Sequence, residues 1–349
     1  MNKINRKSLL KYPGGKAREI IKIRPFFPKD AHRFIDPFVG GGSVWLDSEY
    51  SYNLINDYSS DLINLYRSVK KEDFINFLKL YCEDLSQLVL SEKVINEISE
   101  TKDMITIYDL VLEYGRNINI SFPFLSHKFK LELPKYLKRK VNYLEKKGII
   151  SVQDTIDLLQ TAVNGAYYNA VRSFYNSYNG QDSLRAAIYL YIREFCYSSM
   201  FRFSKSGNFN VPYGGKSYNN KNFKSHIDYY GSQFMSNKLK TTEIYNLDFE
   251  DFINKIKVVE NDFIFLDPPY DSEFSTYDNN SFDKEEQIRL ANLIKTLKCK
   301  WMLVIKNSEL IRSLYPSNQF NYFDYSNRYS VNFKNRNIQN VKHLVITNY

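Results

Sequence analysis

Hydrophobic residues recur along the chain with two different periods. Short apolar runs end in acidic, glycine or proline residues, which predicts buried strands of a largely parallel sheet. Other stretches place apolar residues at three- and four-residue spacing, which predicts amphipathic helices. The predicted strands lie in 33–46, 52–57, 259–270, 300–308 and 341–349, and the predicted helices in 61–81 and 282–297.

The middle of the chain follows a different pattern. Residues 158–174 and 183–200 predict helices, and the charged stretch 130–148 predicts a polar connector. Residues 201–220 contain clustered glycine and proline, which predicts a loop or a β-hairpin. We therefore expect an α/β body built from residues 1–65 and 236–349, split by a mainly helical insertion at residues 66–235.

The composition of the chain favours a polyanionic binding partner. The 349 residues carry a net charge of +9, and aromatic residues make up 16% of the chain. Basic charge with abundant aromatic rings suits phosphate contact and base stacking. The sparse cysteines Cys82, Cys196 and Cys299 form no metal-ligand cluster, so we expect no zinc site and a reducing cytoplasm.

Two further classes of segment are not expected. The apolar run near the basic N-terminus is only two leucines long, which is too short for a signal peptide. No stretch approaches about 18 apolar residues, the length that a membrane-spanning helix requires. The sequence therefore predicts neither a secretory leader nor a membrane anchor.

One predicted strand ends in an unusual tip, FIFLDPPY (263–270). Two consecutive prolines remove two backbone donors, fix two φ angles and hold the preceding Asp267 extended. The tip presents one carboxylate, the carbonyls of Pro268 and Pro269, and the ring of Tyr270. A strand-terminating turn explains a lone Pro-Pro pair equally well.

A glycine-rich turn follows the first predicted strand, in DPFVGGGSVWL (36–46). Consecutive glycines let the backbone approach a ligand closely, and Asp57 lies at the end of the next strand, about 20 residues on, where an acid can bind ribose hydroxyls. Trp45 stands where the nicotinamide-binding GxGxxG motif needs its third glycine. PGGKA (13–17) also lacks the pattern of a phosphate-binding P-loop. A plain turn and an adenosine-type site both remain open.

Together, four motifs resemble the Dam-type DNA adenine-N(6) methyltransferases. They are YPGGK (12–16), DPFVGGGSVWL (36–46), IND (55–57) and DPPY (267–270), in the order found in that family. Further similarity lies in 202–214, 279–294 and 335–349, whereas 75–180 is longer than in a minimal member. The resemblance implies a Rossmann-like methyltransferase sheet with an inserted, mainly helical target-recognition domain that carries a β-hairpin.

The resemblance also assigns the catalytic tip. Asp267 and the Pro268 carbonyl would accept the two hydrogens of an adenine amine, with Pro269 stiffening the turn and Tyr270 stacking on the base. Preorganised acceptors of this kind favour a tetrahedral, nucleophilic nitrogen. Because the base is out of reach inside a duplex, it would be flipped out.

By the same resemblance, the methyl donor is S-adenosylmethionine and no metal is needed. Asp57 would take its ribose hydroxyls, and Asp248 lies where the family contacts its adenine. The remaining cofactor residues are Tyr12, Gly14, Gly15, Lys16 and Asp267, with Asp36, Phe38, Gly40 and Gly42 around its methionine part. Core packing is the alternative for Tyr12 and Phe38.

For DNA, Arg202 would contact guanine and Lys11 a second guanine, and GATC is the favoured recognition sequence. Arg202 contacting only phosphate is the alternative. The expected partners are double-stranded DNA and, in a restriction–modification setting, a cognate endonuclease, in the cytoplasm of a bacterium or a phage-infected cell. The remaining DNA-contacting residues are Tyr197, Ser198, Met200 and Pro212.

Other functions stay open at this point. RNA adenine methylation would use the same chemistry, and a non-catalytic DNA-binding regulator would use the same scaffold. An oxidoreductase would need the missing GxGxxG motif. The basic stretch 135–147 fits either a phosphate track or a solvated helix face.

Overall fold

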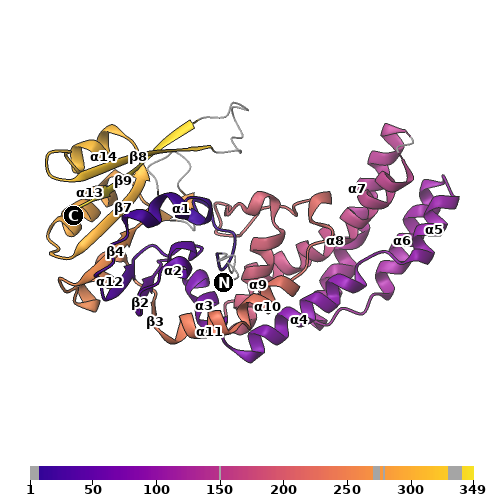
Figure 1. The fold of residues 1–349 in the computed structure, drawn as a ribbon. Coiled ribbons are helices and arrows are strands. Elements are labelled where there is room, and N and C mark those ends of the chain that lie inside the picture. Colours follow the sequence, from indigo (N-terminus) through magenta and orange to yellow (C-terminus); the bar gives the residue numbers. More distant parts are fainter. Residues whose placement is uncertain (1–7, 149–150, 270–275, 278–279, 329–339) are drawn as a thin grey trace. The chain divides into compact units, whose positions relative to one another are not determined.

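The computed structural model describes residues 8–148, 151–269, 276–277, 280–328 and 340–349. The chain forms two compact units, one built from Met1–Tyr66 with Asn237–Tyr349 and the other from Arg67–Ser236. The indigo start and the orange-to-yellow end of the chain thus share one unit, while the magenta middle forms the other (Figure 1). No helix in the part that the structure describes is long and apolar enough to cross a membrane.

The first unit contains a seven-stranded sheet in the order β3-β2-β1-β4-β7-β9-β8. Neighbouring strands from β3 to β7 run parallel, and β9 is antiparallel to both β7 and β8. This confirms the predicted α/β class. The strands are β1 (Arg33–Asp36), β2 (Tyr52–Asn56), β3 (Thr242–Tyr245), β4 (Asp262–Leu266), β7 (Lys300–Lys306), β8 (Asn321–Arg328) and β9 (Asn340–Thr347).

The central strands are hydrophobic because both faces of the sheet are covered. Every residue of β4 is buried, and Ile264 of β4 lies opposite Ile35 of β1. Helices α12 (Phe249–Ile256) and α13 (Lys284–Lys295) bury apolar residues against one face. The unit also contains α1 (Ile20–Ile23), α2 (Ser43–Asp47), α14 (Glu309–Leu314), most of α3 (Ser60–Ser68) and a short pair β5 (Thr276–Tyr277) and β6 (Asn280–Ser281).

The second unit is helical. Residues 130–148, predicted as a polar connector, instead belong largely to the helix α7 (Pro123–Lys147), which contains Pro134. The prediction was wrong because the charged residues hide a row of buried ones, Leu125, Phe129, Leu133 and Leu137, at four-residue spacing. The other helices are α4 (Glu72–Gln87), α5 (Glu92–Glu100), α6 (Met104–Asn117), α8 (Val152–Ser177), α9 (Ser183–Phe195), α10 (Lys224–Tyr230) and, at the unit boundary, α11 (Gln233–Lys240).

The 196–213 segment of the second unit is a hairpin-shaped loop tied to α8. Two isolated antiparallel bridges, Cys196 with Tyr213 and Phe203 with Phe209, close it. Asn176 of α8 donates to the Phe209 carbonyl over 3.1 Å and accepts the Phe209 N–H over 2.9 Å. Arg172 and Tyr168, one and two turns earlier on α8, both donate to the Val211 carbonyl. Because these α8 residues are spaced by four, one face of the helix fixes the loop.

Candidate active site

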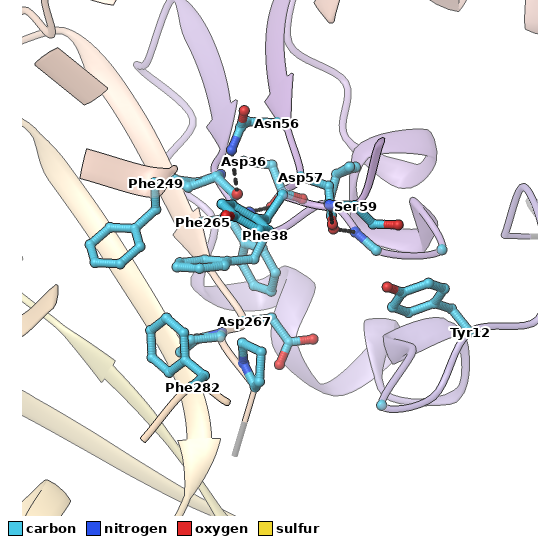
Figure 2. Close-up of a pocket in the computed structure, with 18 of the residues that line it drawn as sticks. Tyr12, Asp36, Phe38, Asn56, Asp57, Ser59, Phe249, Phe265, Asp267 and Phe282 are labelled. Atoms are coloured by element: carbon cyan, nitrogen blue, oxygen red, sulfur yellow. Dashed lines mark hydrogen bonds between the residues drawn. The ribbon is translucent and has the colours of Figure 1, made fainter. Parts of the chain in front are cut away.

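A cavity of about 390 Å³ opens at the carboxyl ends of β1 and β4, and all of it lies in the first unit. This is where an open α/β sheet places its ligands, and the volume is typical of a small-molecule site. Figure 2 shows the Asp267 carboxylate between the Tyr12 ring on one side and Phe38 and Phe282 on the other. The predicted residues that line it are Tyr12, Gly14, Gly15, Lys16, Asp36, Phe38, Gly40, Asp57, Asp248, Asp267, Pro268 and Pro269.

The glycine turn forms one wall of the cavity. Gly40 and Gly42 have φ angles of 48° and 73°, which L-residues with side chains rarely adopt. Gly40 lines the cavity, whereas Gly42 is the N-cap of α2, and the Gly42 amide donates to the Val39 carbonyl over 2.8 Å. A Cβ atom at Gly42 would lie 2.3 Å from the Tyr66 hydroxyl. The turn therefore requires glycine at this position for both its conformation and its packing.

Asp57 holds this turn in place. One carboxylate oxygen accepts the Gly40 amide and the other accepts the Ser59 amide, each over 3.0 Å. A carboxylate oxygen has more than one lone pair, so each oxygen can accept a further donor. Asp57 thus shapes the glycine turn and presents acceptors at the cavity, as binding a vicinal diol requires.

The segment that precedes α1 packs on the same turn. The Leu9 amide donates to the Gly41 carbonyl over 2.8 Å, and a Cβ at Gly40 would meet the Tyr12 ring at 3.2 Å. Lys16 is 1% exposed, and its Nζ lies 2.7 Å from Asp267 Oδ1 and 2.9 Å from the Gly14 carbonyl. The YPGGK motif therefore joins the two walls formed by the glycine turn and the DPPY tip.

Acidic side chains outnumber basic ones around the cavity, which is lined by Asp36, Asp57, Asp248, Asp267 and Glu286 and by Lys16 and Arg289. Burial raises the pKa of Asp36 well above the usual range, and the nearby Asp267 and Asp57 raise it further, although the Phe38 amide opposes them. Burial also raises the pKa of Asp267, and Lys16 counteracts part of that rise. A bound cation would stabilise Asp36 and Asp267 in their charged forms, so this part of the cavity favours a cationic ligand.

Asp248 is engaged in an ion-pair network that the sequence did not reveal. Its carboxylate caps α12 by accepting the Glu250 amide. It also accepts hydrogen bonds from Nη1 and Nη2 of Arg289, over 2.9 and 2.7 Å. The Arg289 guanidinium also lies over the Phe249 ring, 4.2 Å from its centroid. Phe249, Glu286 and Arg289 were not predicted because their positions in α12 and α13 indicate only helix packing. The other lining residues that the sequence did not single out include Asn56, Ser59, Leu247 and Phe282.

A second residue of α13 fixes the DPPY tip. Gln287 is 1% exposed, and its Nε2 donates to the Pro269 carbonyl over 3.0 Å. This bond occupies the second proline's carbonyl and orients the turn that carries Asp267. Tyr270 lies outside the described residues.

Replacing Gln287 by leucine is expected to lower kcat by about tenfold. The variant loses the hydrogen bond that positions the DPPY tip, and one such bond contributes about 1 kcal/mol. Stopped assays at saturating DNA and methyl donor measure kcat, and calorimetry measures cofactor affinity, which we expect to be unchanged. Asn292→Leu, on the exposed face of the same helix, is the control. An unaltered kcat in Gln287→Leu would show that the tip holds its shape without this bond.

The predicted DNA-contacting residues divide between the two units. Lys11 is exposed in the first unit, directly before Tyr12. The other five lie on the 196–213 segment, where Arg202 is exposed and its Nε donates to Asn210 over 2.9 Å. Ser198 and its neighbour Ser199 have φ angles of 53° and 51°, and such strained residues concentrate at functional sites. Tyr197, Ser198 and Pro212 are exposed, and Met200 is half-buried.

A parallel sheet with one antiparallel strand, a glycine turn after β1 and a carboxylate tip after β4 is consistent with the fold of the S-adenosylmethionine-dependent methyltransferases. The profile of the D12 class N6 adenine-specific DNA methyltransferases matches residues 12–331. The chain belongs to this family and is an adenine-specific DNA methyltransferase, as the four motifs predict.

Several curated proteins match over nearly the whole chain. Type II methyltransferase M.CviBI of Paramecium bursaria Chlorella virus NC1A is 27% identical and aligns over 98% of this chain and 100% of its own. Type II methyltransferase M1.LlaDCHI of Lactococcus lactis subsp. cremoris is 24% identical, over 100% and 97%. The DNA adenine methylase of Haemophilus influenzae is 23% identical, over 91% and 86%.

Proposed function

We propose that this adenine-specific DNA methyltransferase takes its methyl group from S-adenosylmethionine and transfers it to a flipped-out adenine in a short duplex sequence. The observation that carries the donor assignment is the cavity wall on which the carboxylates of Asp36, Asp57 and Asp267 lie near one another. A sulfonium and an ammonium group complement this negative charge. A cavity of about 390 Å³ also has room for a nucleoside with an amino-acid tail.

The residues fit this donor in a simple division of roles. Asp57 accepts its ribose hydroxyls, while Asp36 and the turn at Gly40 hold the methionine part. Tyr12, Phe38, Gly14 and Gly15 shape the walls, Gly42 sets the conformation of the glycine turn, and Asp248, fixed by Arg289, borders the adenine. When bound, the donor supplies an electrophilic methyl group.

The DPPY tip prepares the nucleophile. Adenine's exocyclic nitrogen is poorly nucleophilic because its lone pair is delocalised into the ring. Asp267 and the Pro268 carbonyl accept its two hydrogens, which favours a tetrahedral nitrogen with a localised lone pair. Pro269 is already bonded to Gln287, so the Pro268 carbonyl is the acceptor left for the base at this turn. Stacking on Tyr270 would hold the base in place.

Base recognition is assigned to the 196–213 segment together with Lys11. Arg202 extends from one arm of the hairpin-shaped loop, and its bond to Asn210 on the other arm orients the guanidinium. An oriented guanidinium reads guanine by a bidentate contact in the major groove. Met200 and Pro212 offer apolar surface for a thymine methyl, and Tyr197 and Ser198 fill the space of the flipped base.

Arg202→Ala is expected to relax specificity at one base pair, by about 1–3 kcal/mol of lost discrimination. The measurement compares kcat/KM on the cognate duplex with kcat/KM on duplexes changed at one position. Lys205→Ala, an exposed neighbour on the same loop, serves as the control. A uniform loss on all duplexes would instead make Arg202 a phosphate contact.

Long-read modification sequencing tests the whole proposal. DNA from a methylation-deficient bacterial host that expresses the chain should carry N6-methyladenine in a single motif, with GATC favoured. A different motif would retain the chemistry and move specificity to other residues of the second unit. Such a motif would also direct the search for a cognate endonuclease, the partner expected of a cytoplasmic restriction–modification pair.

Two other outcomes have distinct meanings. Methylation of RNA but not DNA by the purified protein would redirect the catalytic assignment to RNA. A folded protein that binds S-adenosylmethionine and DNA but modifies neither nucleic acid would be a regulator. The intact glycine turn, Asp267 and the family membership all favour the enzyme.

A further inference from the structure

Helix α7 carries an excess of positive charge that the helices around it lack. Its 25 residues include seven lysines and Arg139 but only two acids, Glu132 and Glu145. In α4, α5, α6 and α8, by contrast, acidic residues outnumber basic ones. Among these five helices of the second unit, the positive charge is therefore concentrated on α7.

One face of the carboxyl-terminal half of α7 combines basic and aromatic side chains. We call this face the basic strip; its members recur at three- and four-residue spacing and are Tyr136, Arg139, Tyr143, Lys146 and Lys147. The Arg139 guanidinium lies 5.6 Å from the centroid of the Tyr136 ring, and Lys147 Nζ lies 6.0 Å from that of the Tyr143 ring. Tyr136 is half-buried and the other four side chains are exposed. The strip thus presents three cations to solvent, two of them resting on aromatic rings.

The two acids of α7 do not neutralise the basic strip. Glu132 already pairs with two other lysines of the helix, over 3.5 and 3.1 Å. Glu145 projects about 100° around the helix from Lys146. Within the described part of the chain, no ion pair involves Arg139, Lys146 or Lys147. A favourable interaction with the helix dipole accounts for two lysines in the last turn but not for Arg139, which lies two turns earlier.

The basic strip begins beside the segment assigned to base recognition. A Cβ atom at Gly165 of α8 would lie 2.9 Å from the Tyr136 ring and 3.9 Å from the Tyr213 ring, so α7, α8 and that segment meet at this glycine. Burial raises the pKa of Tyr136, whereas Arg172, an anchor of the same segment, and Arg139 oppose that rise. Both guanidinium groups therefore lie near the Tyr136 hydroxyl. From this point the strip continues along α7 (Figure 1).

We propose that the basic strip binds backbone phosphates of the duplex DNA that flanks the recognition sequence. The helix rises about 16 Å from Tyr136 to Lys147, a length that matches about five base pairs of duplex. Contacts of lysine and arginine with phosphates position a protein on DNA but carry no sequence information. The inference rests on the assignment of the 196–213 segment to base recognition, and it gives α7 a role in affinity and not in specificity.

The test compares two triple variants of the full-length enzyme that lose the same charge. The strip variant is Arg139→Gln/Lys146→Gln/Lys147→Gln. The control variant removes three exposed lysines elsewhere in the same unit and is Lys71→Gln/Lys79→Gln/Lys102→Gln. Fluorescence anisotropy over a range of salt concentrations measures the affinity for two cognate duplexes. The short duplex ends about two base pairs from the motif, and the long duplex extends about ten base pairs on each side, beyond the reach of the strip.

The salt dependence should change for one variant on one duplex. Each lost phosphate contact lowers the slope of log affinity against log salt by about 0.9, so the strip variant should lose about 2.7 from its slope on the long duplex. Between about 50 and 200 mM salt, its affinity should therefore fall about fortyfold less than that of the wild type. The control variant should keep the wild-type slope on both duplexes, and all three proteins should agree on the short duplex.

Other results would contradict the proposal. Equal slopes for the strip and control variants on the long duplex would show that the strip only faces solvent. A reduced slope on the short duplex as well would place the strip on the recognition sequence itself. Arg139→Gln alone, which leaves the last helical turn intact, should lose about 0.9 from the slope and serves if the triple variant melts early. Equal wild-type affinity for cognate and scrambled long duplexes would instead refute the role of the 196–213 segment, whatever the strip does.

Discussion

Asp267→Ala is expected to reduce methyl transfer by about a thousandfold, a larger loss than we expect from any other single substitution in the cavity. The variant loses the carboxylate that accepts a hydrogen of the substrate amine and that pairs with Lys16 at 2.7 Å. Single-turnover assays with preformed complexes measure the chemical step directly. DNA affinity should stay near that of the wild type, because the 196–213 segment is unchanged.

The pH dependence gives a second measure of the same carboxylate. Asp267 acts as an acceptor only when ionised, and burial raises its pKa above the usual aspartate value. The rate should therefore fall as the pH drops through that raised pKa, above the ordinary value of about 3.9. Asp267→Asn, which keeps an acceptor oxygen without the charge, should lose this limb. Turnover by Asp267→Ala near the wild-type rate would refute the mechanism.

Asp57→Ala is expected to weaken S-adenosylmethionine binding by about a hundredfold. The substitution removes the proposed hydroxyl acceptor and also releases the amides of Gly40 and Ser59, each held over 3.0 Å. Charged hydrogen bonds contribute about 1.5–3 kcal/mol each, so losing even one accounts for most of this change. Calorimetric titration with the donor, in the absence of DNA, measures the affinity.

Two further variants serve as controls for the loss of S-adenosylmethionine affinity in Asp57→Ala. Glu260→Ala removes an exposed carboxylate from the loop before β4 and should bind normally. Asp57→Asn keeps one acceptor oxygen and should fall between the wild type and Asp57→Ala. If Asp57→Ala binds the donor normally but melts earlier, Asp57 only braces the glycine turn.

The cavity residues were accessible from sequence because parallel strands end at a common edge. Asp36, Asp57 and Asp267 each follow a buried apolar run, so one sheet brings them to one cavity. Arg289 and Gln287 were not accessible, since their positions on α13 fit an ordinary amphipathic helix. Which neighbour a helix residue reaches depends on how the helix crosses the sheet, and periodicity does not encode that.

The elements that the sequence did not predict also depend on tertiary contacts, which the spacing of apolar residues does not encode. The edge strands β3 and β8 were missed because edge strands mix exposed polar residues into the apolar pattern. Helix α7 was taken for a connector because its basic residues, seven lysines and Arg139, outnumber its seven buried residues. The anchoring of the 196–213 segment by Tyr168, Arg172 and Asn176 depends on contacts between residues more than thirty positions apart.

The strand order has a consequence for how the chain is made. β1 and β2 leave the ribosome early, yet their outer neighbours β4 and β3 follow only after the whole of Arg67–Ser236. The helical unit can form from contiguous chain while the first two strands wait with two open edges. If translation pauses before β3, the open edges of β1 and β2 stay exposed to aggregation. A chaperone that covers these edges should therefore raise the yield of active enzyme.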